Sequence, residues 1–308
     1  MTSPPEHPQA ADEQRTVAGR YLLERPVGRG GMGTVWLAHD RKLDRRVAIK
    51  EVRYPEAVSE QERQLLEQRT LREARSAARF SSPRTTTVHD VVDEGGRPWI
   101  VMEYVESRTL GELVSAHGPL PPVDVARIGL DLLDALEAAH KVDVVHRDVK
   151  PGNVLLDGTG RAWLTDFGIA TSVGDETLSD QGVLLGSPSF MAPERARGEN
   201  AGPFADLWSL GATLYAAVEG RGPFDRGEPM ATLLAVTVEP PTPPERANGL
   251  TPVLLGLLAK EPTERMTGWQ AREALQAAVS QAGSVSASAF PASDISSQQP
   301  VMAPPPRA

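Results

Sequence analysis

The amino-acid sequence predicts an α+β fold with two lobes: a small antiparallel-sheet lobe carrying one long helix, and a larger, mostly helical lobe. Residues 21–105 contain short segments rich in β-branched and aromatic residues, separated by glycine and proline turns. Residues 106–280 instead show apolar residues at the helical period. A cleft between two such lobes is the expected place for a ligand.

Length and composition fit this architecture and exclude several classes of function. The 308 residues are 40% hydrophobic and 24% charged, which is ordinary for a globular protein. A net charge of −9 offers no basic excess for nucleic acid or an anionic membrane surface. No cysteine is present, which excludes thiolate chemistry and fits a reducing compartment, so we expect a cytoplasmic location. No apolar run approaches the roughly 18 residues of a membrane span, although tethering through a longer chain stays open.

The two ends of the chain differ in composition from its middle. Residues 1–20 are polar and proline-rich, and we expect a disordered leader without the features of a signal peptide. Residues 281–308 are mainly Ser, Ala, Pro and Gln, which favours a disordered tail or linker. The folded part is therefore expected over residues 21–280.

Three glycines, Gly28, Gly30 and Gly33, stand between the strand-like segments 21–27 and 34–38. In dinucleotide-binding proteins such glycines open a helix, whereas here a strand-like segment follows them. The pattern predicts a hairpin flap that can lie over phosphates, and a plain glycine hairpin fits it equally well. A Walker-type loop is excluded because no Gly-Lys-Ser/Thr follows.

Lys50 ends an apolar strand, either as its exposed end or as a cation directed at phosphate oxygens. A capping box beginning at Ser59 predicts a long helix over residues 59–80. Glu73 on this helix can face inward and pair with Lys50. Glu67 lies on a face with several apolar residues, so periodicity leaves both glutamates open.

The remaining elements follow from hydrophobic periodicity and turn signals. The pattern predicts a hairpin over residues 91–105 and helices at 110–117, 122–140, 206–218 and 267–280. The polar, hydroxyl-rich stretch between them, residues 169–190, is typical of a mobile loop.

The stretch around Asp148 carries a set of groups suited to phosphoryl transfer. Asp148 can accept a proton from a hydroxyl, and Lys150 can neutralise negative charge beside it. Asn153 and Asp166 offer oxygen ligands of the kind that Mg²⁺ takes. Residues 154–165 read as a hairpin, which brings Asn153 and Asp166 side by side. Any one of these residues alone fits a solvated loop or a tight turn.

Together, and in this order, these segments resemble a protein kinase from Tyr21 to about Ser280. The residues at 28–33 and 146–153 are most similar to those of bacterial, eukaryotic-like serine/threonine kinases. The resemblance implies transfer of the γ-phosphate of ATP to Ser or Thr hydroxyls of protein substrates, with Mg²⁺ as cofactor and Mn²⁺ as an alternative ion. The resemblance also implies that the chain can form a homodimer through its small lobe.

The resemblance assigns roles in nucleotide binding and catalysis. Lys50 is expected to hold the α- and β-phosphates and to be oriented by Glu73, with Asp148 as the catalytic base and Asn153 and Asp166 as metal ligands. The other expected nucleotide contacts are the glycines Gly28, Gly30 and Gly33, the adenine-sandwiching Val27, Val35, Ala48 and Leu155, the gatekeeper Met102, and the backbone of Glu103 and Val105.

Further residues receive structural roles from the resemblance. Ser187 is expected to shape the acceptor site, Glu194 and Arg265 to form a buried pair, and Asp206 to hold the catalytic-loop backbone. Arg147 is expected to receive a phosphate carried by the loop.

Four hydroxyls in the loop are candidates for that phosphate: Thr171, Ser172, Thr177 and Ser179, of which the mid-loop Thr177 and Ser179 are favoured. The sequence departs from the family pattern at Ser82–Thr87, which predicts different packing behind the helix that bears Glu73, and at Met266. Two rival functions stay open, an ATP-binding pseudokinase scaffold and a small-molecule phosphotransferase with the same cleft.

Overall fold

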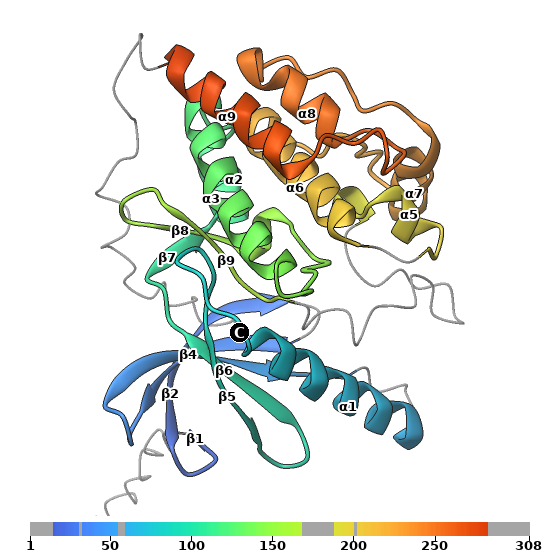
Figure 1. The fold of residues 1–308 in the computed structure, drawn as a ribbon. Coiled ribbons are helices and arrows are strands. Elements are labelled where there is room, and N and C mark those ends of the chain that lie inside the picture. Colours follow the sequence, from blue (N-terminus) through green and yellow to red (C-terminus); the bar gives the residue numbers. More distant parts are fainter. Residues whose placement is uncertain (1–14, 31–32, 55–58, 168–187, 200–201, 283–308) are drawn as a thin grey trace, which may run out of the picture.

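The N-terminal lobe is built on an antiparallel sheet whose strand order is β1-β2-β3-β4-β6-β5 (Figure 1). The computed structural model describes residues 15–30, 33–54, 59–167, 188–199 and 202–282. The strands of this sheet are β1 (Thr16–Val17), β2 (Tyr21–Gly30), β3 (Gly33–Asp40), β4 (Arg45–Val52), β5 (Val88–Asp93) and β6 (Pro98–Glu103). Its two ends approach each other, because the Tyr21 hydroxyl donates to the Asp90 carboxylate at 2.9 Å.

The first strand corrects the predicted leader. Thr16 and Val17 pair with β2, and the Val17 side chain is fully buried in the core of the sheet. Ala18 and Gly19 have positive φ angles, and the tight turn that they form returns the chain into β2. The ordered lobe therefore begins earlier than residue 21, while residues 1–14 lie outside the described part of the chain.

Helix α1 (Glu60–Ala77) packs against β5 and β6. Its predicted capping box is confirmed: the Ser59 hydroxyl accepts from the Glu62 N–H at 3.3 Å, and the Glu62 carboxylate accepts from the Ser59 N–H at 2.7 Å. Small residues, Ala74 and Ala77, form the buried side of the helix. Their size lets the helix axis lie close to the sheet.

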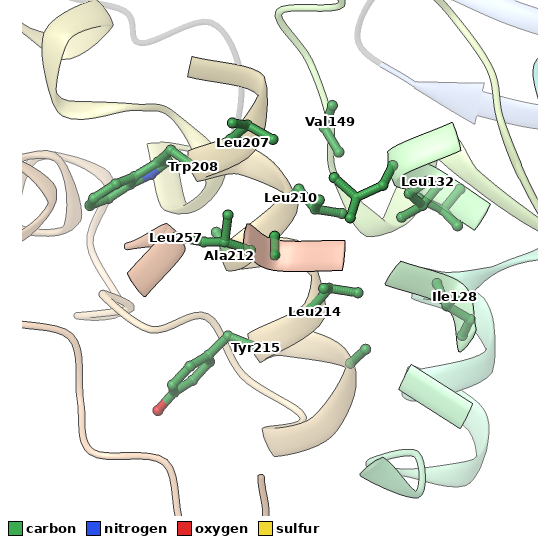
Figure 2. Packing of buried hydrophobic residues seen from close by; sticks show 14 of the residues in the cluster. Ile128, Leu132, Val149, Leu207, Trp208, Leu210, Ala212, Leu214, Tyr215 and Leu257 are labelled. Carbon is green, nitrogen blue, oxygen red and sulfur yellow. The ribbon is translucent and has the colours of Figure 1, made fainter. Parts of the chain in front are cut away.

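The C-terminal lobe is organised around α6 (Pro203–Glu219), in which every residue from Ala205 to Val218 is buried. Figure 2 shows its side chains packed between Leu132 of α3 and Leu257 of α8. A helix that is apolar all round is expected at the centre of a lobe. The other helices are α2 (Leu110–His117), α3 (Pro122–His140), α5 (Pro193–Ala196), α7 (Pro229–Val238), α8 (Thr251–Leu257) and α9 (Gly268–Ala282).

A second, three-stranded sheet lies where the lobes meet (Figure 1). It has the order β7-β8-β9, with β7 (Ser107–Thr109), β8 (Val154–Asp157) and β9 (Ala162–Leu164). The predicted hairpin of residues 154–165 is confirmed, with Leu155 opposite Trp163. Asp157 stabilises its turn by accepting hydrogen bonds from the N–H groups of Thr159 and Arg161.

The predicted helices 110–117 and 122–140 have the observed bounds, and the last helix runs two residues beyond Ser280, to Ala282. Residues 283–308 lie outside the described part of the chain. In that part, no helix combines the length and apolar character needed to cross a bilayer.

Candidate functional site

A cavity of about 240 Å³ lies between the lobes. Its lining includes Val27, Gly28, Val35, Ala48, Met102 and Glu103 from the N-terminal lobe, Val105 from the connection between the lobes, Leu155 from strand β8, and Thr165 and Asp166, which follow strand β9. All five side chains predicted to surround an adenine therefore line one cavity. Its lining combines these apolar side chains with polar and charged groups such as Thr165 and Asp166, a combination that suits a small-molecule site.

The two residues of the connection that were predicted to bind the base, Glu103 and Val105, differ in the hydrogen bonding of their backbone N–H groups. The Glu103 N–H donates to the Thr87 carbonyl at 2.8 Å. The Val105 carbonyl accepts from the Ser107 hydroxyl at 2.9 Å, while the Val105 N–H has no hydrogen-bond partner among the described residues. Of the two residues predicted to bind the base, Val105 thus retains a free N–H in the cavity wall.

The predicted glycines are divided between this cavity and the adjoining end of the hairpin. Gly28 lines the cavity, whereas Gly30 and Gly33 face each other across the β2–β3 pair. Gly33 has a φ of +139°, and a Cβ there would lie 1.8 Å from the Glu51 carbonyl oxygen. Only glycine fits at this position.

Lys50 and Asp166 meet at the inner end of the cavity. The Lys50 ammonium lies 2.9 Å from Oδ2 of Asp166, and the two side chains are 8% and 16% exposed. Oδ1 of Asp166 is buried without a hydrogen-bond partner. Asp166 also has a φ of +65°, an uncommon backbone conformation that often marks functional sites.

The predicted partner of Lys50 is different in this structure. Glu73 lies with its carboxylate 3.9 Å from Nη1 of Arg147, and the ion pair formed by Lys50 is the one with Asp166. The reason is geometric: α1 presents Ala74 and Ala77 to the sheet, while Glu73 lies toward the catalytic-loop arginine. The orientation of Lys50 by Glu73 is therefore not the arrangement observed among the described residues.

Asp148 lies in a cluster of donors. Its Oδ2 accepts from the Lys150 ammonium at 2.7 Å and from Nδ2 of Asn153 at 2.9 Å. Asn153 Nδ2 also donates to the Asp148 backbone carbonyl at 2.8 Å, so the amide oxygen of Asn153 is not needed to hold this loop. Both donors hold the Asp148 carboxylate in one position.

Asp206 holds the catalytic-loop backbone, as the resemblance predicted. Its fully buried carboxylate accepts from the N–H of His146 at 2.8 Å and from the N–H of Arg147 at 2.7 Å, and it lies 2.7 Å from Nε2 of His140. Burial lowers the pKa of His146. The ring of His146 accordingly fits the neutral form, with Nε2 donating to the Thr165 carbonyl at 2.9 Å and Nδ1 accepting from the Asp148 N–H at 3.2 Å.

The predicted pair of Glu194 and Arg265 is also confirmed. Two hydrogen bonds of 2.8 and 3.0 Å join the side chains, which are almost fully buried. Arg265 further donates to the carbonyls of Phe204, Ala259 and Lys260. Five other predicted residues lie outside the described residues: Thr171, Ser172, Thr177, Ser179 and Ser187.

The residues present fit a magnesium ion. The unpartnered, buried Oδ1 of Asp166 is an oxygen ligand without a protein partner, and Asn153 can supply a second. No cluster of three or more His, Asp or Glu residues suited to a metal occurs in the described ranges. An ion held here would complete its coordination with phosphate and water oxygens, as Mg²⁺ usually does.

Sequence reasoning missed about half of the residues that line the cavity, among them Thr86 and Thr165. Thr165 directly precedes Asp166 and ends the predicted hairpin, so its place could have been inferred from the order of the motifs. Thr86 lies in the segment Ser82–Thr87, where the sequence departs from the family pattern and offers no motif to align.

Comparison with known proteins identifies the family to which this chain belongs. The family model for the protein kinase domain matches residues 21–279. The chain is 37% identical over 257 residues to the serine/threonine-protein kinase PrkC of Bacillus subtilis, covering 82% of this chain and 39% of the relative. It is 37% identical over 262 residues to the serine/threonine-protein kinase PknA of Mycobacterium tuberculosis, covering 81% of this chain and 59% of PknA.

A third relative, the probable serine/threonine-protein kinase PknB of Corynebacterium glutamicum, is 36% identical over 264 residues, which cover 81% of this chain and 40% of that protein. The chain thus spans between two fifths and three fifths of the length of these curated relatives. By the extent of the family match and by these identities, the chain belongs to the protein kinase family.

Proposed function

We propose that this chain is an ATP-dependent serine/threonine protein kinase. The observation that carries the proposal is the ion pair of 2.9 Å between Lys50 and Asp166, a residue of the cavity wall, beside the hydrogen-bonded pair of Asp148 and Asn153. The retention of all four residues weighs against a scaffold without turnover. Small-molecule phosphotransferases usually lack the long loop closed by Ala192, Pro193 and Glu194 and the helix that contains Asp206, and the presence of both segments weighs against that class.

In the proposed phosphoryl transfer, each residue of the site acts by its position and its charge. The adenine lies among the apolar side chains of the cavity, and the Val105 N–H donates to it. The Lys50 ammonium contacts the phosphate oxygens, while Asp166 and Asn153 would hold Mg²⁺, which neutralises charge on the transferred group.

Asp148 receives the proton of the acceptor hydroxyl. The hydroxyl oxygen of a Ser or Thr side chain forms a bond to the γ-phosphorus, the bond from phosphorus to the bridging oxygen breaks, and ADP leaves. The Lys150 ammonium, 2.7 Å from Asp148, stabilises negative charge beside the reacting hydroxyl. The protein forms no covalent bond to the phosphoryl group.

The test is transfer of label from ATP to protein. The chain is incubated with γ-labelled ATP and Mg²⁺, with and without a generic basic protein, and the Asp148→Asn variant is run beside it. Labelled phosphoserine or phosphothreonine that depends on Asp148 supports the proposal. Nucleotide binding without transfer would instead identify a scaffold. Replacing Mg²⁺ by Mn²⁺ in the same assay tests the choice of ion.

The proposal includes phosphorylation of the loop that follows Asp166, at Thr177 or Ser179. Arg147, whose side chain is 40% exposed, is the cation expected to receive that phosphate. A phosphopeptide map made after incubation with ATP and Mg²⁺ tests this step. A map without phosphate between Asp166 and Glu194 would remove it.

Protein substrates, a cytoplasmic location of the catalytic domain and a homodimer through the N-terminal lobe belong to the same proposal. The absence of cysteine fits a reducing compartment. Sedimentation of the chain over a range of concentrations tests the dimer, which is rejected if the mass stays that of one chain.

A further inference from the structure

The segment Ser82–Thr87, where the sequence departs from the family pattern, is attached to strand β9. Thr85 and Leu164 form a parallel β-bridge. The Leu164 N–H donates to the Arg84 carbonyl at 2.8 Å, and the Thr86 N–H donates to the Leu164 carbonyl at 3.1 Å. A segment of the N-terminal lobe thus extends the sheet that leads into Asp166.

Thr165 is the residue in which these connections converge. Its N–H donates to the Asn153 carbonyl at 3.0 Å, and its carbonyl accepts from Nε2 of His146 at 2.9 Å. Its hydroxyl accepts from the Thr86 hydroxyl at 3.0 Å and lies 3.9 Å from Sδ of Met102, to which it can donate. Every hydrogen-bonding group of Thr165 is therefore engaged.

The hydroxyl groups of Thr86 and Thr165 lie close to Asp166, so a small displacement of either threonine can move the Asp166 carboxylate. Thr86 is 9% exposed, and both threonines line the cavity. The next residue, Asp166, has a φ of +65° and a buried Oδ1 without a partner. A left-handed conformation of a non-glycine residue persists only when its neighbours hold it, and Thr165 is the neighbour that precedes Asp166 in the chain.

We propose that Thr86 is a positioning residue for the metal-binding carboxylate. Its hydroxyl fixes Thr165, and Thr165 in turn fixes Asp166 and the backbone of Asn153, so that their oxygens converge on one ion. The inference rests on the proposed function for its ligand, magnesium nucleotide. Groups one step removed from a metal ligand commonly change metal affinity when they are replaced.

The test compares three variants of the whole chain. Thr86→Val removes the hydroxyl and keeps the shape of the side chain, and Thr86→Ser keeps the hydroxyl. The matched control is Thr85→Val, which removes an equally buried hydroxyl that bonds to Ser82 and not to Thr165. Calorimetric titration with ADP, with and without Mg²⁺, measures the affinity of each variant in the absence of turnover.

The expected result is that the variants change the affinity for ADP differently in the presence and in the absence of Mg²⁺. Thr86→Val raises the Kd of ADP in Mg²⁺ by about threefold to tenfold more than it changes the metal-free Kd, which is the size of one lost hydrogen bond. Thr86→Ser and Thr85→Val bind as the wild type does. Thr165→Val added to Thr86→Val produces no further loss, because both variants break the same bond.

Three outcomes overturn the inference: an unchanged magnesium dependence in Thr86→Val, an equal loss in Thr85→Val, or an equal loss of metal-free binding. None of these requires phosphate transfer. A wild-type chain that binds magnesium–ADP but transfers no phosphate would refute the proposed function and leave the role of Thr86 measurable by the same titration.

Discussion

The Lys50 ammonium lies 2.9 Å from the Asp166 carboxylate, so a charge from strand β4 meets a charge that follows strand β9 across the cavity. The two residues are 116 positions apart in the chain, and both are largely buried. This ion pair places a cation and a carboxylate next to each other, so both can reach the phosphates of one nucleotide.

Lys50→Met is expected to reduce phosphate transfer by about 100-fold or more, because the phosphates lose their cation and Asp166 loses its ion partner. Lys42→Met, at an exposed lysine outside the cavity, is the control and retains the wild-type rate. Initial rates with labelled ATP measure both. A Lys50→Met variant with near wild-type activity would contradict the assigned role.

Asp148→Asn is expected to lower the transfer rate by about 100-fold to 10,000-fold, because the acceptor hydroxyl loses its base. The donors Lys150 and Asn153 lie 2.7 and 2.9 Å from Oδ2 of Asp148, outside the adenine end of the cavity. ADP affinity should therefore stay within about twofold of the wild type. Transfer rates and ADP titrations on the same preparation separate the loss of rate from a loss of nucleotide binding. An equal loss of ADP binding would show that Asp148 supports the structure of the cavity instead.

Asp206→Asn tests the support of the catalytic loop. An amide presents a donor where two N–H groups now donate to a buried carboxylate, so we expect a loss of about 1.5–3 kcal/mol in the free energy of unfolding. The control is Asp143→Asn, at an exposed position with a φ of +58° that asparagine tolerates. Urea unfolding measures both variants. Equal midpoints would show that the hydrogen bonds to Asp206 contribute little.

The order of the motifs predicted the cavity well, because each motif couples a residue type to a local structure. The hairpin between Asn153 and Asp166 follows from an apolar run, a turn and a second apolar run, and the structure has it. The pair of Glu194 and Arg265, 71 residues apart, came only from the resemblance, since no local pattern links two such distant residues.

The partner of Lys50 could not be predicted in the same way. Periodicity leaves both Glu67 and Glu73 open, and whether the Glu73 carboxylate reaches Lys50 or Arg147 depends on how the helix lies on the sheet. Strand β1 was missed because two residues give no measurable alternation. Helices α7 and α8 were missed because they are short and rich in apolar residues, so periodicity is hard to read in them.

The buried pair of Glu194 and Arg265 gives a stability prediction. Arg265→Met leaves the Glu194 carboxylate buried without a cation, and we expect it to cost about 3–5 kcal/mol. Replacing both residues, Glu194→Gln with Arg265→Met, should cost less than the two single changes added together. Denaturant unfolding of the four proteins gives the coupling. Additive losses would mean that the two side chains stabilise the lobe independently.

The pH dependence of stability should report on Asp40. Its carboxylate accepts from Arg20 at 2.7 and 2.8 Å and from two backbone N–H groups, and the hydrogen bonds from Arg20 lower its pKa to about 2. Because the folded state holds this proton less tightly than the unfolded chain, the carboxylate stabilises the fold above pH about 4. That contribution is lost as the pH falls toward 2.

Asp40→Asn removes this titration. The variant should be less stable than the wild type at pH 6, and the difference should shrink steadily between pH 4 and pH 2, because the wild-type carboxyl becomes protonated over that range. Urea midpoints at closely spaced pH values measure it, with Asp44→Asn at an exposed neighbouring site as control. A difference that stays constant across this interval would show that the loss comes from the shape of the turn and not from the charge on Asp40.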